Sequence, residues 1–206
     1  MPVGVKGEIV IKGENVMAGY WKNPSATAET VIDGWLHTGD MGYMGKDGFL
    51  YVLGRFKSLL ISSDGEKYSP EGMEEAMVDK SPYIDQIILH NNQNPYTVAV
   101  VVPNKDALHK AGGSDAAKAA ELIDGEIRKY RTGGEFGGEF PDRWLPAALI
   151  IVDEAFSEKN GLVNSTMKVV RNKVEAHFKE RIDYAYTAEG KQLLNEKNLA
   201  SLAKLL

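Results

Sequence analysis

The first quarter of the chain has short apolar runs separated by turn residues, a pattern typical of β-strands. Three runs have the composition and flanks of strands: Glu8–Lys12, Trp35–Thr38 and Phe49–Leu53. A turn is expected at Lys46–Gly48. Asn23–Glu29 is expected to be a turn that leads into a brief helix, with Ser25 or Pro24 at its start. Because so few strands have no clear second layer to bury them, we do not expect this part to be a domain of its own.

After Leu53 the pattern alternates between strands and helices. Strands are expected at Ile84–Leu89, Thr97–Val102 and Ala147–Val152. Ser69-Pro70-Glu71 combines an N-cap hydroxyl, a proline suited to the first helical position and an early acid, so it predicts a helix start. The apolar face of this helix would consist of Met73, Ala76 and Met77.

The rest of the chain has further helical spacing and two polar segments. A helix after Gly112–Ser114 would pack one apolar side, made of Ala116, Ala119, Ala120, Ile123 and Ile127. Val170, Val174 and Phe178 follow helical spacing, and Gln192–Leu206 is expected to be a short packing helix. His90–Pro95 is predicted to be a polar loop and Thr132–Gly138 a mobile one. This order predicts an α+β fold, a compact sheet with helices on it.

Composition narrows the class of protein. The chain has 206 residues, 43% hydrophobic and 26% charged, as in ordinary soluble globular proteins. Its net charge of −5 argues against non-specific nucleic-acid binding, and the lack of cysteine excludes disulfides, thiolate metal sites and a cysteine nucleophile. No apolar run approaches the roughly 18 residues of a membrane span, and the N-terminus lacks a signal-peptide core. We expect a cytoplasmic protein with at most peripheral membrane contact.

Three charged residues are candidate ligands of an anionic substrate. Asp40 follows a glycine at the end of a strand-like run, where its carboxylate could accept hydrogen bonds from a ribose diol. Arg55 follows Gly54, and its guanidinium could hold phosphate or ribose oxygens. Lys168 lies in a polar stretch, from which one compact charge could reach a reacting centre.

Each candidate also has an ordinary structural interpretation. Asp40 could cap its own turn, Arg55 could form a surface salt bridge, and Lys168 could be one solvated lysine among many. Gly65 offers a backbone that a ligand can approach closely, but a glycine turn between a strand and a helix needs no ligand. Taken singly, none of these residues predicts a function.

The order of these residues along the chain, together with the residues around them, does predict a function. The chain contains, in sequence, Gly7-Glu8-Ile9, Val16–Pro24, Ala26–Glu29, Asp33–Trp35, Thr38-Gly39-Asp40, Gly54–Ser58, Asp64–Lys67 and Asn164–Arg171. This series resembles the adenylate-forming superfamily, which contains AMP-forming acyl-CoA synthetases, peptide-synthetase adenylation domains and beetle luciferases. The resemblance extends from Gly4 to about Phe178.

The resemblance implies a role for each candidate. Asp40 would hold the ribose hydroxyls of ATP and AMP, and Arg55 would contact the same nucleotide. Lys57 falls where the family has the hinge between its large and small domains. In one pose the small domain would present Lys168 for adenylation. In the other pose the turn of Gly65, Glu66 and Lys67 would line the CoA tunnel, mainly through backbone atoms.

The same resemblance implies which parts of the enzyme are present. Residues 1–55 would be the β-rich end of the large AMP-binding domain, and residues 56–206 the small mobile α+β domain with a short mixed sheet. The phosphate loop and the Tyr-Gly-x-Thr-Glu motif, whose glutamate helps to bind Mg²⁺, do not occur in this sequence. We therefore expect no metal ligands here, most Mg²⁺ ligands in a missing N-terminal part, and a fragment inactive alone.

A departure from the commonest family motif around Lys168 indicates the class of acid substrate. Many members have Ser-Gly-Lys where this chain has Thr166-Met167-Lys168, and this variant with its flanks resembles long-chain fatty acid–CoA ligases. Phe140–Pro146 also resembles that branch. The expected partners are a fatty acid, ATP, CoA and the missing domain. There are two alternatives. One is an adenylation module that serves a carrier protein, and such a chain would be expected to continue into a carrier domain. The other is a non-catalytic accessory that binds a nucleotide or a partner.

Overall fold

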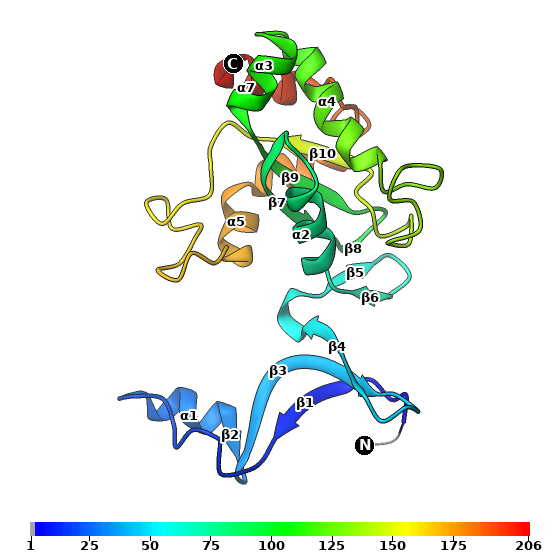
Figure 1. Cartoon of the computed structure of the whole chain (residues 1–206). Helices are drawn as coiled ribbons and strands as arrows, with labels where there is room; N and C mark the ends of the chain where they lie inside the picture. The colour runs from blue at the N-terminus through cyan, green and yellow to red at the C-terminus, as the bar shows by residue number, and fades with distance from the viewer. Residues whose placement is uncertain (1–2) are drawn as a thin grey trace. The chain divides into compact units, whose positions relative to one another are not determined.

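The computed structural model describes residues 3–206, which form two compact units divided between Leu59 and Leu60 (Figure 1). Each unit is described by itself. The division predicted at residues 55 and 56 refers to the domains of a longer enzyme and stays a prediction.

The first unit is a four-stranded antiparallel sheet. Its strands are β1 (Gly7–Ile11), β2 (Val31–Ile32), β3 (Trp35–Met44) and β4 (Leu50–Arg55), and β3 pairs with each of the other three. A short helix, α1 (Pro24–Thr30), precedes β2. The Asn23 side chain accepts a hydrogen bond from the Ala26 N–H at 3.1 Å, so it caps the helix that the sequence predicted.

Strand β3 is longer than the sequence indicated. The expected strand stopped at Thr38, because Thr-Gly-Asp has the composition of a turn. Gly39 takes a φ of 74°, which glycine adopts without strain, and the strand continues beyond it with a register shift between Met41 and Gly42. Asp40 therefore lies inside a strand, whereas the sequence predicts it at the end of one.

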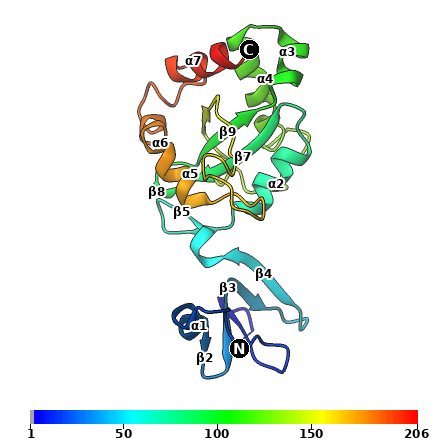
Figure 2. The same ribbon diagram turned by 90° about the vertical axis from the view of Figure 1, so that its left-hand side faces the viewer.

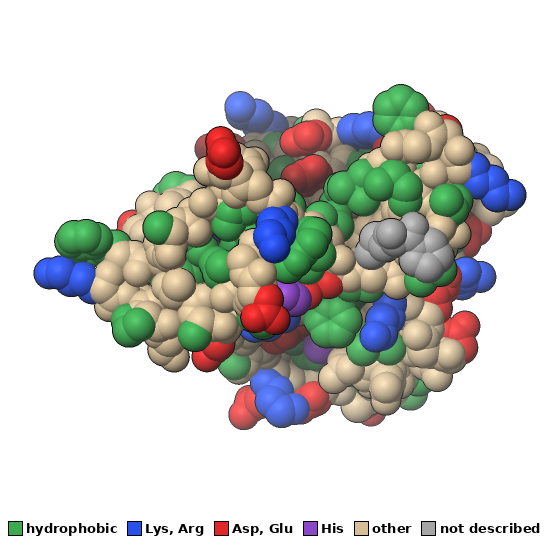
Figure 3. All heavy atoms as spheres, turned by 90° about the horizontal axis from the view of Figure 1, so that it is seen from below, with side chains coloured by type: hydrophobic (Ala, Val, Ile, Leu, Met, Phe, Trp, Pro, Cys, Tyr) green, Lys and Arg blue, Asp and Glu red, His purple; other side chains and the backbone are tan. Residues whose placement is uncertain are grey.

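Large apolar side chains remain on the surface of the first unit (Figure 3). The most exposed are Trp21 at 87%, Phe49 at 70% and Val52 at 63%. Within this unit these side chains have no second layer against which to pack. That residues 1–53 are part of a larger domain stays a prediction.

The second unit is built on a mixed three-stranded sheet in the order β10 (Ala148–Ile151), β9 (Val98–Pro103) and β7 (Ile84–His90). β9 is parallel to β10 and antiparallel to β7. All six residues of β9 are buried, because successive side chains enter opposite cores: Val98 and Val100 pack into one, and Ala99 and Val101 into the other. The three strands that the sequence predicted are confirmed.

Helices cover both faces of this sheet (Figure 2). One core takes residues of α2 (Glu71–Asp79), α3 (Lys105–Gly112), α4 (Ala116–Arg128) and α7 (Glu196–Leu205). The other takes residues of α5 (Arg171–His177) and α6 (Lys179–Ala185). The predicted apolar positions Met73, Met77 and Ile123 are at most 1% exposed, so the helical periodicity identified the buried faces correctly.

A smaller sheet joins segments that lie far apart in the sequence. It consists of β6 (Lys67–Tyr68), β5 (Leu60–Ser62) and β8 (Asn92–Asn94), and β5 is parallel to β8. The sequence predicted a polar loop at 90–95 because Asn-rich stretches have low strand propensity. Pairing with β5 makes part of that loop a strand. Helix α3 was also missed, and a 3₁₀ turn, η1 (Phe56–Ser58), follows β4.

One local prediction, the N-cap at Ser69, needs correction. The Ser69 hydroxyl donates to the Glu71 carboxylate at 3.1 Å and does not cap a backbone N–H. In the Thr132–Gly138 segment the Phe136 N–H donates to the Lys129 carbonyl at 2.8 Å, and a Cβ on Gly134 would lie 2.4 Å from that same oxygen. Gly134 permits this close approach, and the mobility of the segment stays a prediction.

Replacement of Ile123 by alanine tests the core on the α4 side. Ile123 is fully buried, so Ile123→Ala should lower the free energy of unfolding by about 3 kcal/mol through lost burial and a residual cavity. Urea denaturation of the 206-residue chain measures this loss. Leu194→Ala is the matched control, because Leu194 is 43% exposed and its truncation should cost well under half as much. Equal losses would contradict the assignment of this core.

Candidate functional site

Asp40 and Arg55, which the sequence singled out separately, are brought together by the sheet of the first unit. They are register partners on β3 and β4, and the Arg55 Nε lies 3.4 Å from the Asp40 Oδ1. Their side chains are 36% and 69% exposed, Asp40 being the more covered. An exposed ion pair of this kind contributes little to stability. Its chemical character is a carboxylate acceptor beside a guanidinium donor, which suits a ligand that carries both hydroxyls and phosphate.

Glu8 supports the segment that carries Asp40, a role that the sequence did not reveal. Its carboxylate accepts a hydrogen bond from the Gly39 N–H at 3.0 Å and lies 2.8 Å from the His37 Nδ1. The hydrogen bond from His37 is the main reason that the pKa of Glu8 lies below its ordinary value. The Thr38 hydroxyl donates to the Ile9 carbonyl at 2.7 Å and accepts from the Asp40 N–H at 3.0 Å. The backbone at Asp40 is thereby fixed from both sides.

Lys57, the predicted hinge residue, lies in the 3₁₀ turn η1 and is exposed. Its position in a short turn near the end of the first unit is compatible with a pivot. The hinge role itself stays a prediction.

The predicted glycine turn is the tip of the β5–β6 hairpin in the second unit. Gly65 has a φ of 84°, and its N–H donates to the Ser62 carbonyl at 2.9 Å. The Glu66 carbonyl accepts from the Ser62 N–H at 3.0 Å, and the Asp64 carboxylate accepts from the Glu66 N–H at 3.1 Å. A Cβ at Gly65 would meet no atom within 4 Å, so φ and not crowding requires glycine there.

The Glu66 side chain is held by two residues from a distant segment. Arg143 donates from Nε at 2.7 Å and from Nη2 at 2.6 Å, one to each carboxylate oxygen, and the Trp144 Nε1 donates at 3.1 Å. The guanidinium is the main cause that keeps the pKa of Glu66 below its usual range. The Trp144 ring stacks on buried Tyr68 with centroids 5.1 Å apart. Phe140–Pro146 had been noted in the sequence, but no contact with the Gly65 turn was predicted.

Lys168 is exposed on a tight loop of the second unit. The Asn164 Oδ1 accepts from the Thr166 N–H at 3.0 Å and from the Lys168 N–H at 2.9 Å. The Asn164 N–H donates to the Lys168 carbonyl at 2.9 Å, and Val163 and Val169 form an antiparallel bridge. Met167 at the tip takes a φ of 60°. The backbone of this loop is therefore well defined, while the lysine side chain extends into solvent.

The segment that leaves this loop ends in a shielded ion pair. Arg171 donates from Nη2 to both carboxylate oxygens of Glu74, at 2.7 and 2.6 Å, and from Nη1 to the Leu89 carbonyl at 2.7 Å. The two charged side chains are 17% and 14% exposed. Burial raises the pKa of the Glu74 carboxyl, and the Arg171 charge opposes that shift. The sequence analysis quoted Arg171 within the lysine motif without a partner.

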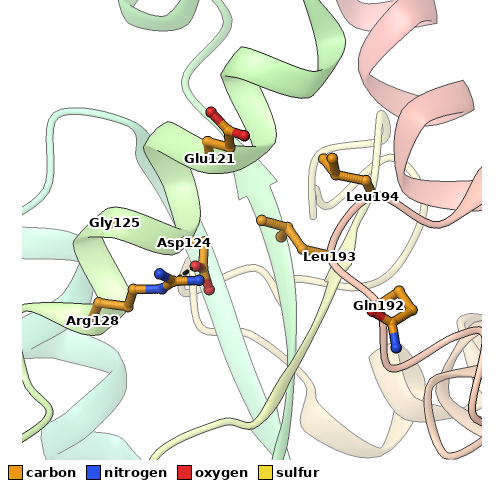
Figure 4. A pocket seen from close by; sticks show the side chains of 7 residues that line it. All are labelled: Glu121, Asp124, Gly125, Arg128, Gln192, Leu193 and Leu194. Carbon is orange, nitrogen blue, oxygen red and sulfur yellow. Dashed lines mark ion pairs between the residues drawn. The ribbon is translucent and has the colours of Figure 1, made fainter.

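Away from these residues, a metal site, a membrane span or a ligand pocket would each require a particular arrangement in the described part of the chain. Among residues 3–206, no group of three or more His, Asp or Glu side chains is arranged to hold a metal ion. Within the same described residues, no helix is both long and apolar enough to cross a bilayer. A hollow of about 510 Å³ lies between α4 and the segment before α7, lined partly by Glu121, Asp124, Arg128 and Leu193 (Figure 4). It contains none of the predicted site residues.

Similarity to known proteins is extensive over this chain but covers a small part of each relative. No family model matches. The long-chain-fatty-acid–[acyl-carrier-protein] ligase AEE15 of Arabidopsis thaliana is 32% identical over 91% of this chain and 26% of its own length. Long chain acyl-CoA synthetase 8 of the same plant is 32% identical, with 88% and 27% covered. Long-chain-fatty-acid–CoA ligase 1 of Cavia porcellus gives the same figures. The chain spans about a quarter of the length of these relatives.

Solved structures agree. The adenylation domain of a Mycobacterium chelonae carboxylate reductase has a TM-score of 0.76 at 28% identity, over 88% of this chain and 28% of that one. The chain belongs to the adenylate-forming enzymes. It corresponds to their C-terminal part and has the α+β fold expected for it. The O-succinylbenzoate CoA synthetase of Bacillus subtilis, solved with AMP, matches with a TM-score of 0.56 at 26% identity, over 85% and 31%. The acid named for this second enzyme, O-succinylbenzoate, is not a long-chain fatty acid.

The ion pair of Glu66 with Arg143 predicts that the free energy of unfolding depends on pH. Because the pKa of Glu66 is lowered in the folded chain, its ion pair contributes stability above the ordinary glutamate pKa and loses it as pH falls through the lowered value. Glu66→Gln should therefore lower the urea midpoint slightly at about pH 7, since the Arg143 side of the pair is exposed, and the difference from wild type should shrink towards about pH 3. Glu158→Gln, at an exposed glutamate, is the control. A difference that grows on acidification would contradict the assignment.

Proposed function

We propose that this chain is the C-terminal part of a long-chain fatty acid–CoA ligase. The whole enzyme would convert a fatty acid and ATP to an acyl-adenylate and pyrophosphate, and then transfer the acyl group to CoA with release of AMP. The observation that carries the proposal is the pairing of Asp40 with Arg55 on neighbouring strands, together with an exposed Lys168 on a backbone-defined loop. The similarity to long-chain ligases supports the choice of acid.

Asp40 and Arg55 would bind the nucleotide. The Asp40 carboxylate would accept hydrogen bonds from the two ribose hydroxyls, since an ionised acceptor gives strong directional bonds to neutral donors. Arg55 would leave its long, weak contact with Asp40 in part to reach the same nucleotide. AMP and ATP occur in solved structures of similar enzymes, which supports this assignment. Mg²⁺ would be held mostly by residues outside this chain.

Lys168 would act in the first half-reaction. Negative charge builds up on the phosphate oxygens when a carboxylate attacks the α-phosphorus, and a single ammonium group stabilises that charge. A flexible lysine side chain on a loop of defined backbone can be placed at such a centre. Gly65, Glu66 and Lys67 would serve the second half-reaction by lining the thiol tunnel, and the small domain would turn about Lys57 between the two.

A carrier protein is the second candidate for the molecule whose thiol accepts the acyl group. One similar relative is named a long-chain-fatty-acid–[acyl-carrier-protein] ligase, and a related structure contains a carrier domain. CoA and the phosphopantetheine arm of a carrier protein end in the same thiol, so the Gly65 turn could line the path of either. Comparison of CoA with a purified acyl-carrier protein as acceptor separates the two. The cytoplasmic location stays a prediction.

The 206-residue chain alone should not activate fatty acids. The phosphate loop and the Mg²⁺-binding glutamate motif are absent from this sequence, so ATP has no triphosphate site here. Fatty-acid-dependent exchange of pyrophosphate into ATP measures the first half-reaction. Pyrophosphate exchange above background with the purified chain would contradict the proposal that the triphosphate site lies outside this chain.

Loss of the Lys168 ammonium should separate the two half-reactions. In the full-length enzyme, Lys168→Ala should reduce adenylation by about 10²-fold or more, because the charge that stabilises the transition state is gone. Thioester formation from supplied acyl-AMP should change little. Lys173→Ala, at an exposed lysine nearby in the sequence, is the control. An equal loss of both half-reactions would contradict the role given to Lys168.

A further inference from the structure

Both functional loops of the Leu60–Leu206 unit are tied to its body by an arginine. We call the contact of Glu66 with Arg143 and Trp144 the turn clamp. We call the contact of Arg171 with Glu74 and Leu89 the loop clamp. Arg143 lies 77 residues from Glu66, and Arg171 lies 97 residues from Glu74. The two clamps share no residue.

The turn clamp occupies both carboxylate oxygens of Glu66. Arg143 donates one hydrogen bond to each oxygen, at 2.7 and 2.6 Å, and Trp144 donates a third at 3.1 Å. The Trp144 ring stacks on Tyr68, whose hydroxyl lies 2.6 Å from the buried Thr97 Oγ1. Contacts therefore run from the turn into the core, and the side chain of Glu66 works as an anchor. The backbone around Gly65 stays open, because a Cβ there would meet no atom within 4 Å.

The turn clamp is too exposed to serve mainly as a source of stability. The Arg143 side chain is 66% exposed, and ion pairs at such positions contribute little. A bidentate guanidinium–carboxylate pair does, however, fix orientation. The geometry of the turn is therefore what Arg143 controls.

The loop clamp uses the open edge of the central sheet. In the part of the chain that the structure describes, β7 pairs with β9 on one side only, so the outward N–H and C=O of Leu89 need other partners. Glu74 accepts from the Leu89 N–H at 2.6 Å, and Arg171 donates to the Leu89 carbonyl at 2.7 Å. Arg171 also binds both oxygens of Glu74.

This second contact is close to Lys168 along the chain. Arg171 follows Lys168 by three residues, a span of at most about 10 Å. The Val170 N–H donates to the carbonyl of buried Leu162 at 2.8 Å. The outgoing limb of the loop is thus held at Val170 and Arg171, and the position of the lysine backbone depends on that attachment.

We propose that the two clamps are separate positioning devices, the loop clamp for adenylation and the turn clamp for thioester formation. Arg171 and Glu74 act through Lys168, and Arg143 and Trp144 act through the Gly65 turn. The inference rests on the proposed function, and it assigns positioning residues for each half-reaction.

The test compares two variants of the full-length enzyme in both half-reactions. The variant E74Q/R171M removes both charges together, so that no buried charge is left unpaired, and the introduced amide keeps an acceptor for the Leu89 N–H. It should slow palmitate-dependent ATP–pyrophosphate exchange by about tenfold to 10²-fold, because a small misplacement of a reacting group costs that much. It should leave thioester formation from palmitoyl-AMP and CoA within about twofold of wild type.

Arg143→Met should give the opposite result, with slow thioester formation and a normal rate of ATP–pyrophosphate exchange. Trp144→Phe keeps an aromatic ring but lacks the N–H, so it should show a smaller effect in the same direction. Arg143→Lys, which keeps the charge without the fork, should recover part of the rate. Arg128→Met is the matched control, since Arg128 pairs with Asp124 away from both clamps.

Amide hydrogen exchange of the same proteins separates this inference from the function on which it rests. Arg143→Met should speed exchange at residues 62–67 alone, and E74Q/R171M at residues 163–170 alone. A wild-type enzyme without palmitate-dependent pyrophosphate exchange would refute the proposed function. If the two half-reactions fell together in either variant, or if neither fell, the two-clamp inference would be wrong. Faster amide exchange throughout the unit would also overturn it.

Discussion

Burial of the central sheet of the second unit on both faces is the constraint on which the rest of that unit depends. Every residue of β9 is enclosed, with alternate side chains entering two separate cores. Such a strand has no side chain available for chemistry. Groups that meet a substrate must then come from loops and sheet edges, which is where the structure places Lys168 and the Gly65 turn. A loop is useful for chemistry only when its backbone is held, and long-range side-chain contacts do this here.

Those contacts are of two physical kinds. Around Lys168 the ion pair of Arg171 with Glu74 is largely shielded from water, so its partners depend strongly on one another. Around Gly65 the pair of Arg143 with Glu66 is exposed at the arginine and contributes orientation more than stability. In the first unit the same task falls to Glu8, whose carboxylate holds the N–H of Gly39 beside Asp40. The segments that carry Asp40, Gly65 and Lys168 are thus each held by a contact with a residue far away in the sequence.

Periodicity predicted the central strands well, because strands buried on both faces are continuous apolar runs of β-branched residues. It also identified the buried faces of α2 and α4. It failed at β8, which is polar and becomes a strand only by pairing with β5. It stopped β3 too early, since a glycine at positive φ bends a strand in some places and ends it in others.

The sequence by itself determined the family, the α+β class and the identity of the candidate residues, because these depend on local pattern and on motif order. The tertiary structure alone decided which residues meet. It paired Asp40 with Arg55 through strand register, joined Glu66 to Arg143, and set Arg171 against Glu74 at a strand edge. The physical reason is that a carboxylate in a sequence carries no mark of its partner. The partner is selected by how the backbone folds and by which polar groups would otherwise be left without a hydrogen bond.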